Sequence, residues 1–486
     1  MNKKVFLRSF MSVASSNLLV VILGVLMLLA LPRLMGSVED YGYWQLYYYY
    51  SGFFGLFLFG LNDGMNLLYA GTKLNKLNKK VINAVLGYII LSTAIIAFLL
   101  GVAALVLIQD SSLRLTFALT AINIFILNVN GFSMHINQVS LRFKEYSIIN
   151  GLERAFFVTS LLPLFFLDVK DYVYYIVLNL VIRFLVALYG ILSIRNILSK
   201  SLISLGNILE ERKVVLGFIR VGWFLTFGTI CATLIGTSSR IVVEHTMSIY
   251  EYGLFAFAFS LSMIVSLLAS ALPTVLYPSL KAIGEVRYNS AISILYLVIV
   301  LAGTLMLSMC FFTPIFLDMF LPEYKNIETY IYLLFPWIIY QLLTTVVIDV
   351  FYRLARLEKR LFINYVLGVV LVFGVQFLAI SLFKDMRIML LAGLVVYSLW
   401  VHYCKYYLFH KSNWKVPVWS YMEIPFIAMF LAVIIMMGYG LISFFVYLAA
   451  WIALSLVVYL IWSKDINNIF IFARNKSSKT SVGGEG

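Results

Sequence analysis

The feature that most constrains the fold is a series of long apolar runs separated by short polar connections. An α-helix needs about 20 residues to cross the hydrocarbon core of a membrane. Fourteen runs reach that length, and we predict spans at residues 10–32, 43–70, 82–108, 114–140, 146–168, 172–194, 214–238, 252–280, 288–313, 327–351, 361–383, 388–410, 419–438 and 441–463. Hydrophobic residues make up 63% of the chain and charged residues only 12%, which excludes a soluble domain. The sequence predicts an all-α polytopic membrane protein.

The distribution of basic residues predicts how the chain crosses the membrane. Alternate connections carry 26 of the 36 lysines and arginines, and the connections between them carry seven. By the positive-inside rule, both termini are cytoplasmic. The net charge of +14 therefore indicates topology and no nucleic-acid partner. The first apolar run lacks a small-residue cleavage site, so we expect it to be a retained helix.

Several positions recur at a constant offset of 211 residues, which indicates an internal duplication. The matches are Asp40-Tyr41-Gly42 with Glu251-Tyr252-Gly253, Asn130 with Gln341, Gln138 with Asp349, and Arg142 with Arg353. Copies of six helices keep the same orientation, so we predict two parallel lobes around a central cavity. The predicted segments are 1–194, an N-terminal lobe; 195–213, an amphipathic linker on the cytoplasmic surface; 214–410, a C-terminal lobe; 411–463, two extra helices; and 464–486, a cytoplasmic tail.

Arginines at membrane depth are the first candidates for binding an anion, because an intramembrane charge is costly and is usually functional. Arg183 lies near the middle of the sixth predicted span. It forms either a structural pair with Glu153 or an anion site that lines a cavity. Arg220 and Arg154 lie about two turns inside their spans, where their side chains are able to reach the interface instead. Arg33 and Arg240 lie at the outer ends of the first and seventh predicted spans. There they serve either as gates of the outer mouth or as anchors at the membrane interface.

Amide side chains form a polar stripe on two repeat-equivalent helices. Asn123, Asn130 and Asn137 are spaced seven apart and so share one helix face. Gln341 lies on the matching helix of the second lobe. Such a stripe serves either as polar contact between helices or as the lining of a wet cavity. The stripe occurs in both copies, which favours a cavity between the lobes.

Two acids are candidates for ion coupling. Asp63 follows Asn62 late in the second span, where Gly60 and Gly64 loosen the helix, and a helix-end role is the alternative. Glu153 is the second candidate. The tyrosine run 47–50 is more typical of an interfacial aromatic belt than of a sugar-stacking platform.

The sequence contains no phosphate-binding loop, no Ser/His/Asp cluster and no metal-ligand spacing. Three scattered cysteines do not form a disulfide framework. We therefore expect neither an enzyme nor a bound cofactor or metal.

The stretch Leu34-Met35-Gly36 through Asp40-Tyr41-Gly42-Tyr43-Trp44, with Gly60-Leu61, resembles the bacterial O-antigen and capsule polysaccharide flippases. These belong to the superfamily of multidrug, oligosaccharidyl-lipid and polysaccharide exporters. The resemblance implies transfer of an undecaprenyl-pyrophosphate-linked oligosaccharide from the cytoplasmic to the periplasmic leaflet of a bacterial inner membrane by alternating access. The candidate arginines would then bind the pyrophosphate, and the amides Asn123, Asn130, Asn137 and Gln341 would contact the glycan. The resemblance also implies contact with membrane lipids, a polysaccharide polymerase and a chain-length regulator.

Two other functions are alternatives to this hypothesis. A multidrug or cation antiporter of the same superfamily commonly has an intramembrane acid in its first helix, and residues 10–32 contain none. A membrane polysaccharide polymerase needs a catalytic outer loop, and the predicted outer loops are too short for one.

Overall fold

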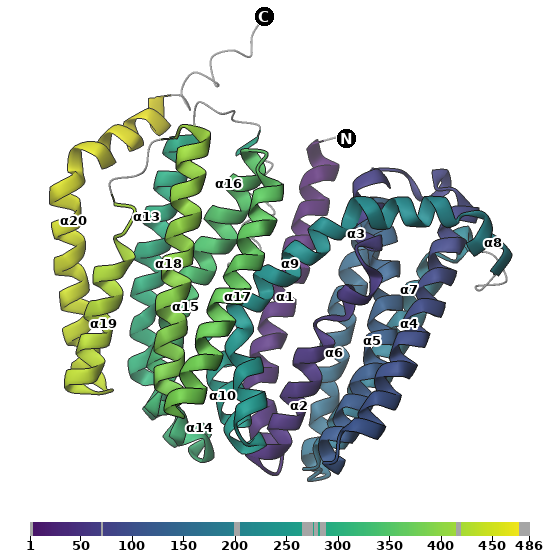
Figure 1. Cartoon of the computed structure of the whole chain (residues 1–486), viewed down its shortest axis with the longest axis horizontal. Helices are drawn as coiled ribbons and strands as arrows, with labels where there is room; N and C mark the ends of the chain where they lie inside the picture. Colours follow the sequence, from purple (N-terminus) through teal and green to yellow (C-terminus); the bar gives the residue numbers. More distant parts are fainter. Residues whose placement is uncertain are drawn as a thin grey trace, which may run out of the picture. The chain divides into compact units, whose positions relative to one another are not determined.

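The computed structural model describes residues 3–69, 71–198, 205–264, 276, 280–281, 288–414 and 419–475. Throughout this part of the chain the regular structure is helical (Figure 1). Two compact units are present. Unit 1 comprises Met1–Leu234 with Met247–Phe257, and unit 2 comprises Ile235–Thr246 with Ala258–Gly486.

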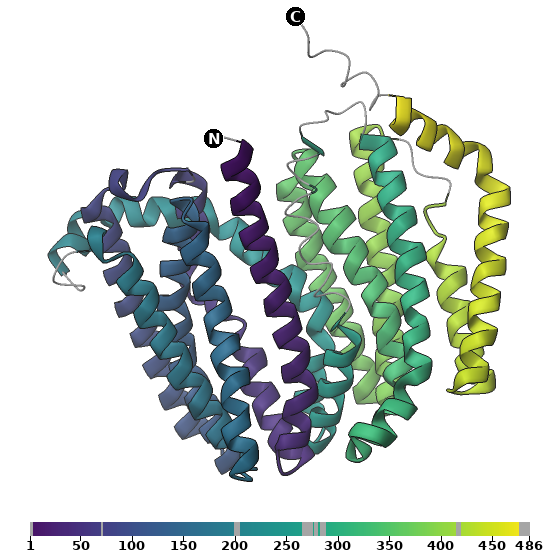
Figure 2. The same cartoon turned by 180° about the vertical axis from the view of Figure 1, so that it is seen from behind.

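Unit 1 is a helical bundle built around one central helix. Its elements are α1 (Lys3–Leu34), α2 (Val38–Ser51), η1 (Phe54–Leu58), α3 (Leu61–Tyr69), η2 (Leu74–Lys76), α4 (Lys79–Leu107), α5 (Ser111–Val139), α6 (Phe143–Phe166), α7 (Tyr172–Ser193), η3 (Arg195–Ile197), α8 (Leu205–Glu210), the first part of α9 (Arg212–Thr246) and most of α10 (Ile249–Ser262). Helix α5 packs against α2, α4, α6 and α7. The bundle of α4 to α7 is visible from both sides in Figures 1 and 2. Most amide and hydroxyl side chains of α5 therefore lie inside unit 1.

Unit 2 is a second helical bundle. Beyond the ends of α9 and α10, its elements are α13 (Tyr288–Met306), η5 (Leu307–Phe312), α14 (Thr313–Phe320), η6 (Pro322–Thr329), α15 (Ile331–Leu342), the π-helical turn η7 (Leu343–Ile348), α16 (Asp349–Leu354), α17 (Glu358–Phe383), α18 (Met386–Ser412), α19 (Glu423–Met437) and α20 (Leu441–Asn475). Helix α15 packs against α13, α18 and α19, and α19 packs against α20. The last two helices are thus part of the same compact unit.

Ten helices within the described residues are long and apolar enough to span a membrane. They are Lys79–Leu107, Ser111–Val139, Phe143–Phe166, Tyr172–Ser193, Arg212–Thr246, Ser290–Phe320, Ile331–Leu354, Glu358–Phe383, Met386–Ser412 and Leu441–Ser463. Two shorter apolar helices, Leu19–Leu34 and Glu423–Met437, bring the candidates to twelve. The protein is a multi-pass membrane protein, and the predicted count of fourteen spans is not confirmed.

The predicted span 43–70 is not one helix. Helix α2 ends at Ser51, and α3 begins only at Leu61. Between them, Phe59 and Gly60 have positive φ angles of 49° and 88°, a left-handed conformation that an α-helix cannot contain. The repeat-equivalent part of the predicted span 252–280 lies outside the described residues.

The described part of the predicted linker 195–213 is two short helical pieces. Ile197 of η3 is buried in the apolar core of unit 1, together with Ile194. Leu205 and Leu209 of α8 are exposed. Residues 199–204 lie outside the described residues, and the membrane-surface position of this linker stays a prediction.

Candidate functional site

A buried ion pair joins two membrane-spanning helices of unit 1. The Arg183 Nε of α7 donates to the Glu153 Oε1 of α6 over 2.7 Å. The Arg183 side chain is 7% exposed and that of Glu153 is 20% exposed. The short 167–171 connection brings α6 and α7 together as neighbours, which is why these two charges meet. The pair is one of the two alternatives that the sequence left open for Arg183.

Tyrosines of α2 cover the guanidinium of Arg183. Its Cζ lies 6.0 Å from the ring centroid of Tyr47 and 5.8 Å from that of Tyr48. The Tyr47 hydroxyl donates to Asn179 Oδ1 over 2.8 Å. Tyr47 is fully buried, so the predicted interfacial belt is wrong for this residue. Its ring faces a buried cation, which is an environment that aromatic faces stabilise.

One donor of Arg183 has no hydrogen-bond acceptor. The Nη1 atom is buried and makes no hydrogen bond to any described residue. A buried donor without a partner costs about 1–3 kcal/mol. The guanidinium is planar and suited to binding two oxygens at once, and anion binding by Arg183 stays a prediction.

The asparagine stripe is buried inside unit 1. The Asn123 amide nitrogen donates to Ser51 Oγ over 2.7 Å. The Asn137 amide nitrogen donates to Ser193 Oγ over 3.0 Å. These bonds connect α5 to α2 and to the end of α7, which is the helix-contact alternative for both residues. Asn130 is buried beside Gly190 of α7.

Gln341 lies in unit 2, at the end of α15, where the helix changes to the π-helical turn η7. Its Oε1 accepts a hydrogen bond from the Tyr397 hydroxyl over 3.1 Å. The Thr344 hydroxyl is 3.2 Å from the same Tyr397 oxygen. Gln341 is half-buried, and its amide lies beside Gly236 of α9. Contact of Gln341 and the three asparagines with a glycan stays a prediction.

The other predicted arginines have separate environments. Arg154 is adjacent to Glu153 in sequence, but its Nη1 donates to the Val20 carbonyl of α1 over 2.9 Å. Arg33 and Arg220 are exposed. Arg240 is buried in unit 2, with its Cζ 5.4 Å from the Phe259 ring centroid. Among the described arginines of unit 1, Arg183 alone is paired with an acid that the sequence had singled out.

Asp63 follows the helix break in unit 1. It lies on α3, is half-buried, and accepts a hydrogen bond from the Thr226 hydroxyl of α9. Close by on α3, the Asn66 amide is 2.7 Å from His135 Nδ1 of α5. Sequence reasoning had no basis for selecting His135, because a lone histidine has no recognisable spacing.

A second buried ion pair in unit 2 was missed by the sequence interpretation. Lys405 of α18 is 2% exposed, and its Nζ lies 3.4 Å from Glu423 Oε1 at the start of α19. Nζ also donates to the Tyr296 hydroxyl over 2.9 Å and to the Ser420 carbonyl over 2.5 Å. The Tyr296 hydroxyl in turn donates to Glu423. Lys405 lies near the end of the predicted span 388–410, where a lysine usually reaches the loop, and its burial is what identifies it as part of the helix packing.

Comparison with known proteins gives a family and a fold. The family model described as "Polysaccharide biosynthesis protein" matches residues 6–284, which is more than half of the chain. No curated protein matches. A structure titled "Lipid II flippase MurJ, inward closed conformation" is similar with a TM-score of 0.60 and 16% identity, covering 96% of this chain and 100% of that one. An inward-facing multidrug resistance MATE family transporter of the MOP superfamily is similar with a TM-score of 0.58 and 12% identity, covering 84% of this chain and 99% of that one. These likenesses show a shared fold.

Proposed function

This chain belongs to the polysaccharide biosynthesis protein family, and from that membership we propose that it is a flippase for a lipid-linked oligosaccharide. The proposed substrate is an undecaprenyl-pyrophosphate-linked repeat unit, which moves from the cytoplasmic to the periplasmic leaflet of the inner membrane for O-antigen or capsule synthesis. Both termini are cytoplasmic in this proposal. The MurJ- and MATE-like fold supports alternating access as the transport mode.

The observation that carries this proposal is the Arg183 guanidinium. A pyrophosphate cannot cross hydrocarbon without a charge partner, because desolvating an unpaired anion is prohibitive. Arg183 is a cation at membrane depth with an unfilled donor at Nη1, and Tyr47 and Tyr48 cover its face. Glu153 holds the guanidinium through Nε and leaves that donor for an incoming phosphate oxygen.

Glu153 also gives the site a way to release its substrate. While the head group is bound, its phosphate oxygens compete with the carboxylate for the same guanidinium. When the head group leaves, the 2.7 Å pair re-forms and neutralises the buried charge. A cation with an internal counter-ion therefore binds an anion reversibly instead of trapping it.

The test separates a substrate contact from a packing contact. Arg183→Met alone leaves Glu153 without its partner, and breaking a buried pair costs about 3–5 kcal/mol. The double variant Arg183→Met/Glu153→Leu removes both charges with side chains of similar size. We expect it to accumulate in the membrane like the wild type and to produce no surface polysaccharide.

The matched control is Lys405→Met/Glu423→Leu, which removes the other buried ion pair. We expect it to retain surface polysaccharide, because we assign that pair no contact with the substrate. If the Arg183→Met/Glu153→Leu strain makes polysaccharide at the wild-type level, Arg183 is a packing residue and the proposed contact is wrong.

Asp63 is the candidate for ion coupling in this proposal. It is the half-buried acid that joins α3 to α9 through Thr226, directly after the break in the membrane helix. Broken membrane helices commonly form ion and substrate sites, because they expose polar groups at depth. A proton or cation bound at Asp63 would change the α3–α9 contact.

A further inference from the structure

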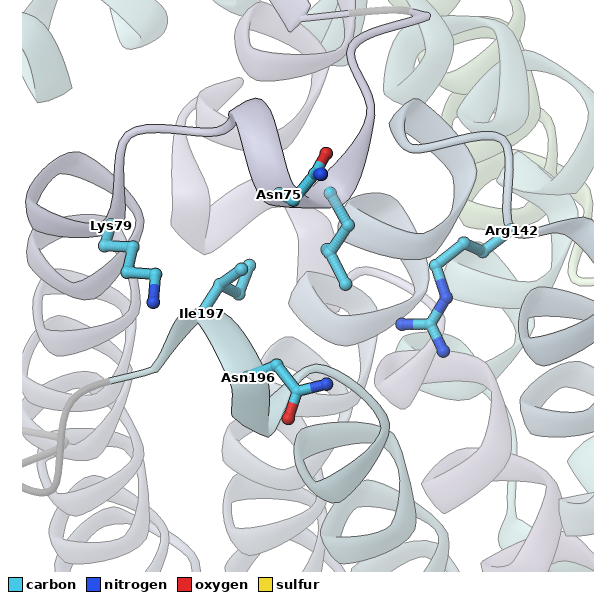
Figure 3. Close-up of a pocket in the computed structure, with 6 residues that line it drawn as sticks. Asn75, Lys79, Arg142, Asn196 and Ile197 are labelled. Atoms are coloured by element: carbon cyan, nitrogen blue, oxygen red, sulfur yellow. The ribbon is translucent and has the colours of Figure 1, made fainter.

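A pocket separate from the Arg183 site lies at one end of unit 1, where four chain segments meet. Its volume is about 490 Å³, within the size range of small-ligand pockets. The lining residues are Leu74, Asn75, Lys79, Arg142, Asn196 and Ile197. Figure 3 shows Lys79 and Arg142 on opposite sides, with Asn196 and Ile197 between them.

Hydrogen bonds hold the lower wall of the pocket in place. The Asn83 amide of α4 donates to the Ile197 carbonyl over 3.2 Å. On the other side, Arg142 Nη1 donates to the Ser193 carbonyl over 2.7 Å. The segment that carries Asn196 is thus fixed at both ends, and the side chain of Ile197 is anchored in the apolar core. The pocket is formed before any ligand arrives.

The charges at this pocket are arranged to receive an anion. Arg142 is partly neutralised by Glu145, whose Oε1 accepts from Nη2 over 3.0 Å. The neighbouring Lys80 is paired with Glu210 at 3.5 Å. Lys79, by contrast, has no ion-pair partner among the described residues and is exposed to the pocket. The lining thus combines one uncompensated cation, a tethered guanidinium and two amides.

An exposed apolar stripe on α7 extends toward the same pocket. Leu185, Leu188 and Leu192 are exposed at spacings of three and four residues, which places them on one face of the helix. Asn196 follows Leu192 four residues later, just beyond the helix end. The stripe therefore ends close in sequence to a residue that lines the pocket.

We propose that this pocket binds the phosphodiester head group of an anionic phospholipid, with an acyl chain along the α7 stripe. The polar lining recognises the phosphate, and the stripe distinguishes a lipid from a free anion. Basic pockets at helix ends are the usual sites for such head groups. The site does not depend on which glycan the protein carries.

The test is thermal unfolding of the full-length protein in detergent, titrated with phosphatidylglycerol, phosphatidylcholine or inorganic phosphate. We expect phosphatidylglycerol alone to raise the unfolding temperature. Lys79→Gln should weaken its apparent affinity about fivefold, the effect of one basic residue near an anionic head group. Lys73→Gln, an exposed lysine of the same connection that does not line the pocket, should change the affinity less than about twofold.

A second variant tests the lipid assignment. Leu192→Asn should weaken binding of phosphatidylglycerol, because it interrupts the apolar stripe. Equal weakening by Lys79→Gln and Lys73→Gln would mean a diffuse basic surface and would overturn the pocket. Stabilisation by inorganic phosphate, with no effect of Leu192→Asn, would identify a free-anion site and overturn the lipid assignment.

Discussion

At the residue scale, two buried Arg/Lys–Glu ion pairs within the described residues have different surroundings. The Lys405 Nζ donates to the Tyr296 hydroxyl and the Ser420 carbonyl and pairs with Glu423, so it has three acceptors. Arg183 has Glu153 on Nε and an unfilled donor at Nη1. A fully satisfied pair stabilises packing, and a pair with an unfilled donor is able to accept a ligand. This difference separates their proposed roles.

The Lys405 pair predicts a stability effect. Lys405→Met should destabilise the protein by about 3–5 kcal/mol, because it leaves Glu423 buried without a cation. Lys405→Met/Glu423→Leu should recover most of that loss. Thermal unfolding of the purified variants checks both values, and a double variant no more stable than the single one would contradict the pairing.

The contact between Asp63 and Thr226 predicts a transport effect without a folding effect. Asp63→Asn keeps an oxygen that accepts the Thr226 hydroxyl proton but removes the charge. We expect normal protein amounts and loss of the dependence of transport on an imposed proton or sodium gradient. Unchanged gradient dependence in this variant would exclude Asp63 from coupling.

Some of the site follows from sequence, and the rest depends on packing. Arg183 and Glu153 are on consecutive apolar runs, so their pairing was one of the expected alternatives. Tyr47 could not be assigned, because a tyrosine run looks the same whether it faces lipid head groups or a buried cation. Lys405 lies near the end of its predicted span, where counting charges assigns it to a loop.

At the element scale, the break between α2 and α3 depends on glycines that contact α9. A Cβ added to Gly222 would overlap Gly60 and Gly64, and one added to Gly64 would overlap the Phe218 backbone. Gly60 also has a positive φ of 88°. Close approach of the two backbones therefore requires glycine on both sides.

Glycine substitutions in α9 test this crossing. Gly222→Ala should destabilise the protein by about 1–3 kcal/mol or more, the usual effect of overpacking. Gly217→Ala, in the same helix with nothing within 4 Å of its added Cβ, should be neutral or slightly stabilising. Unfolding temperatures of the two variants provide the comparison, and equal losses would argue against a close crossing.

The sequence predicts the break between α2 and α3 only partly. Gly60 and Gly64 indicate a loosened helix, but apolar residues are frequent on both sides of Gly60, so the pattern did not separate two helices. The left-handed Phe59 has no sequence signature, because its conformation is imposed by the tertiary contact. In the same way, the seven-residue spacing placed Asn123, Asn130 and Asn137 on one face but did not reveal that this face is covered within unit 1.

At the scale of the whole molecule, hydrophobic run length was enough to predict the fold class. The all-helical, multi-pass architecture follows from the need to satisfy every backbone hydrogen bond inside lipid. The number of spans was harder to predict, because a broken helix such as α2–α3 has the same composition as a continuous one. The two compact units have other bounds than the lobes 1–194 and 214–410, and the two-lobe division stays a prediction.

The orientation can be tested by cysteine labelling in intact cells. In a Cys231→Ser background, with Cys310 and Cys404 buried, we expect Lys76→Cys to be protected from an impermeant thiol reagent. Lys325→Cys, on an opposite and exposed connection, should be labelled. The reverse pattern would invert the topology and the proposed direction of transport.

The most direct measurement of the central claim is flipping by the purified protein in liposomes. The liposomes carry an undecaprenyl-pyrophosphate-linked oligosaccharide, and a glycosidase that cannot enter reports the fraction in the outer leaflet. We predict that wild-type protein makes the inner pool accessible, and that Arg183→Met/Glu153→Leu behaves like protein-free liposomes. Wild-type protein that leaves the inner pool protected, or a double variant that flips at the wild-type rate, would contradict the account.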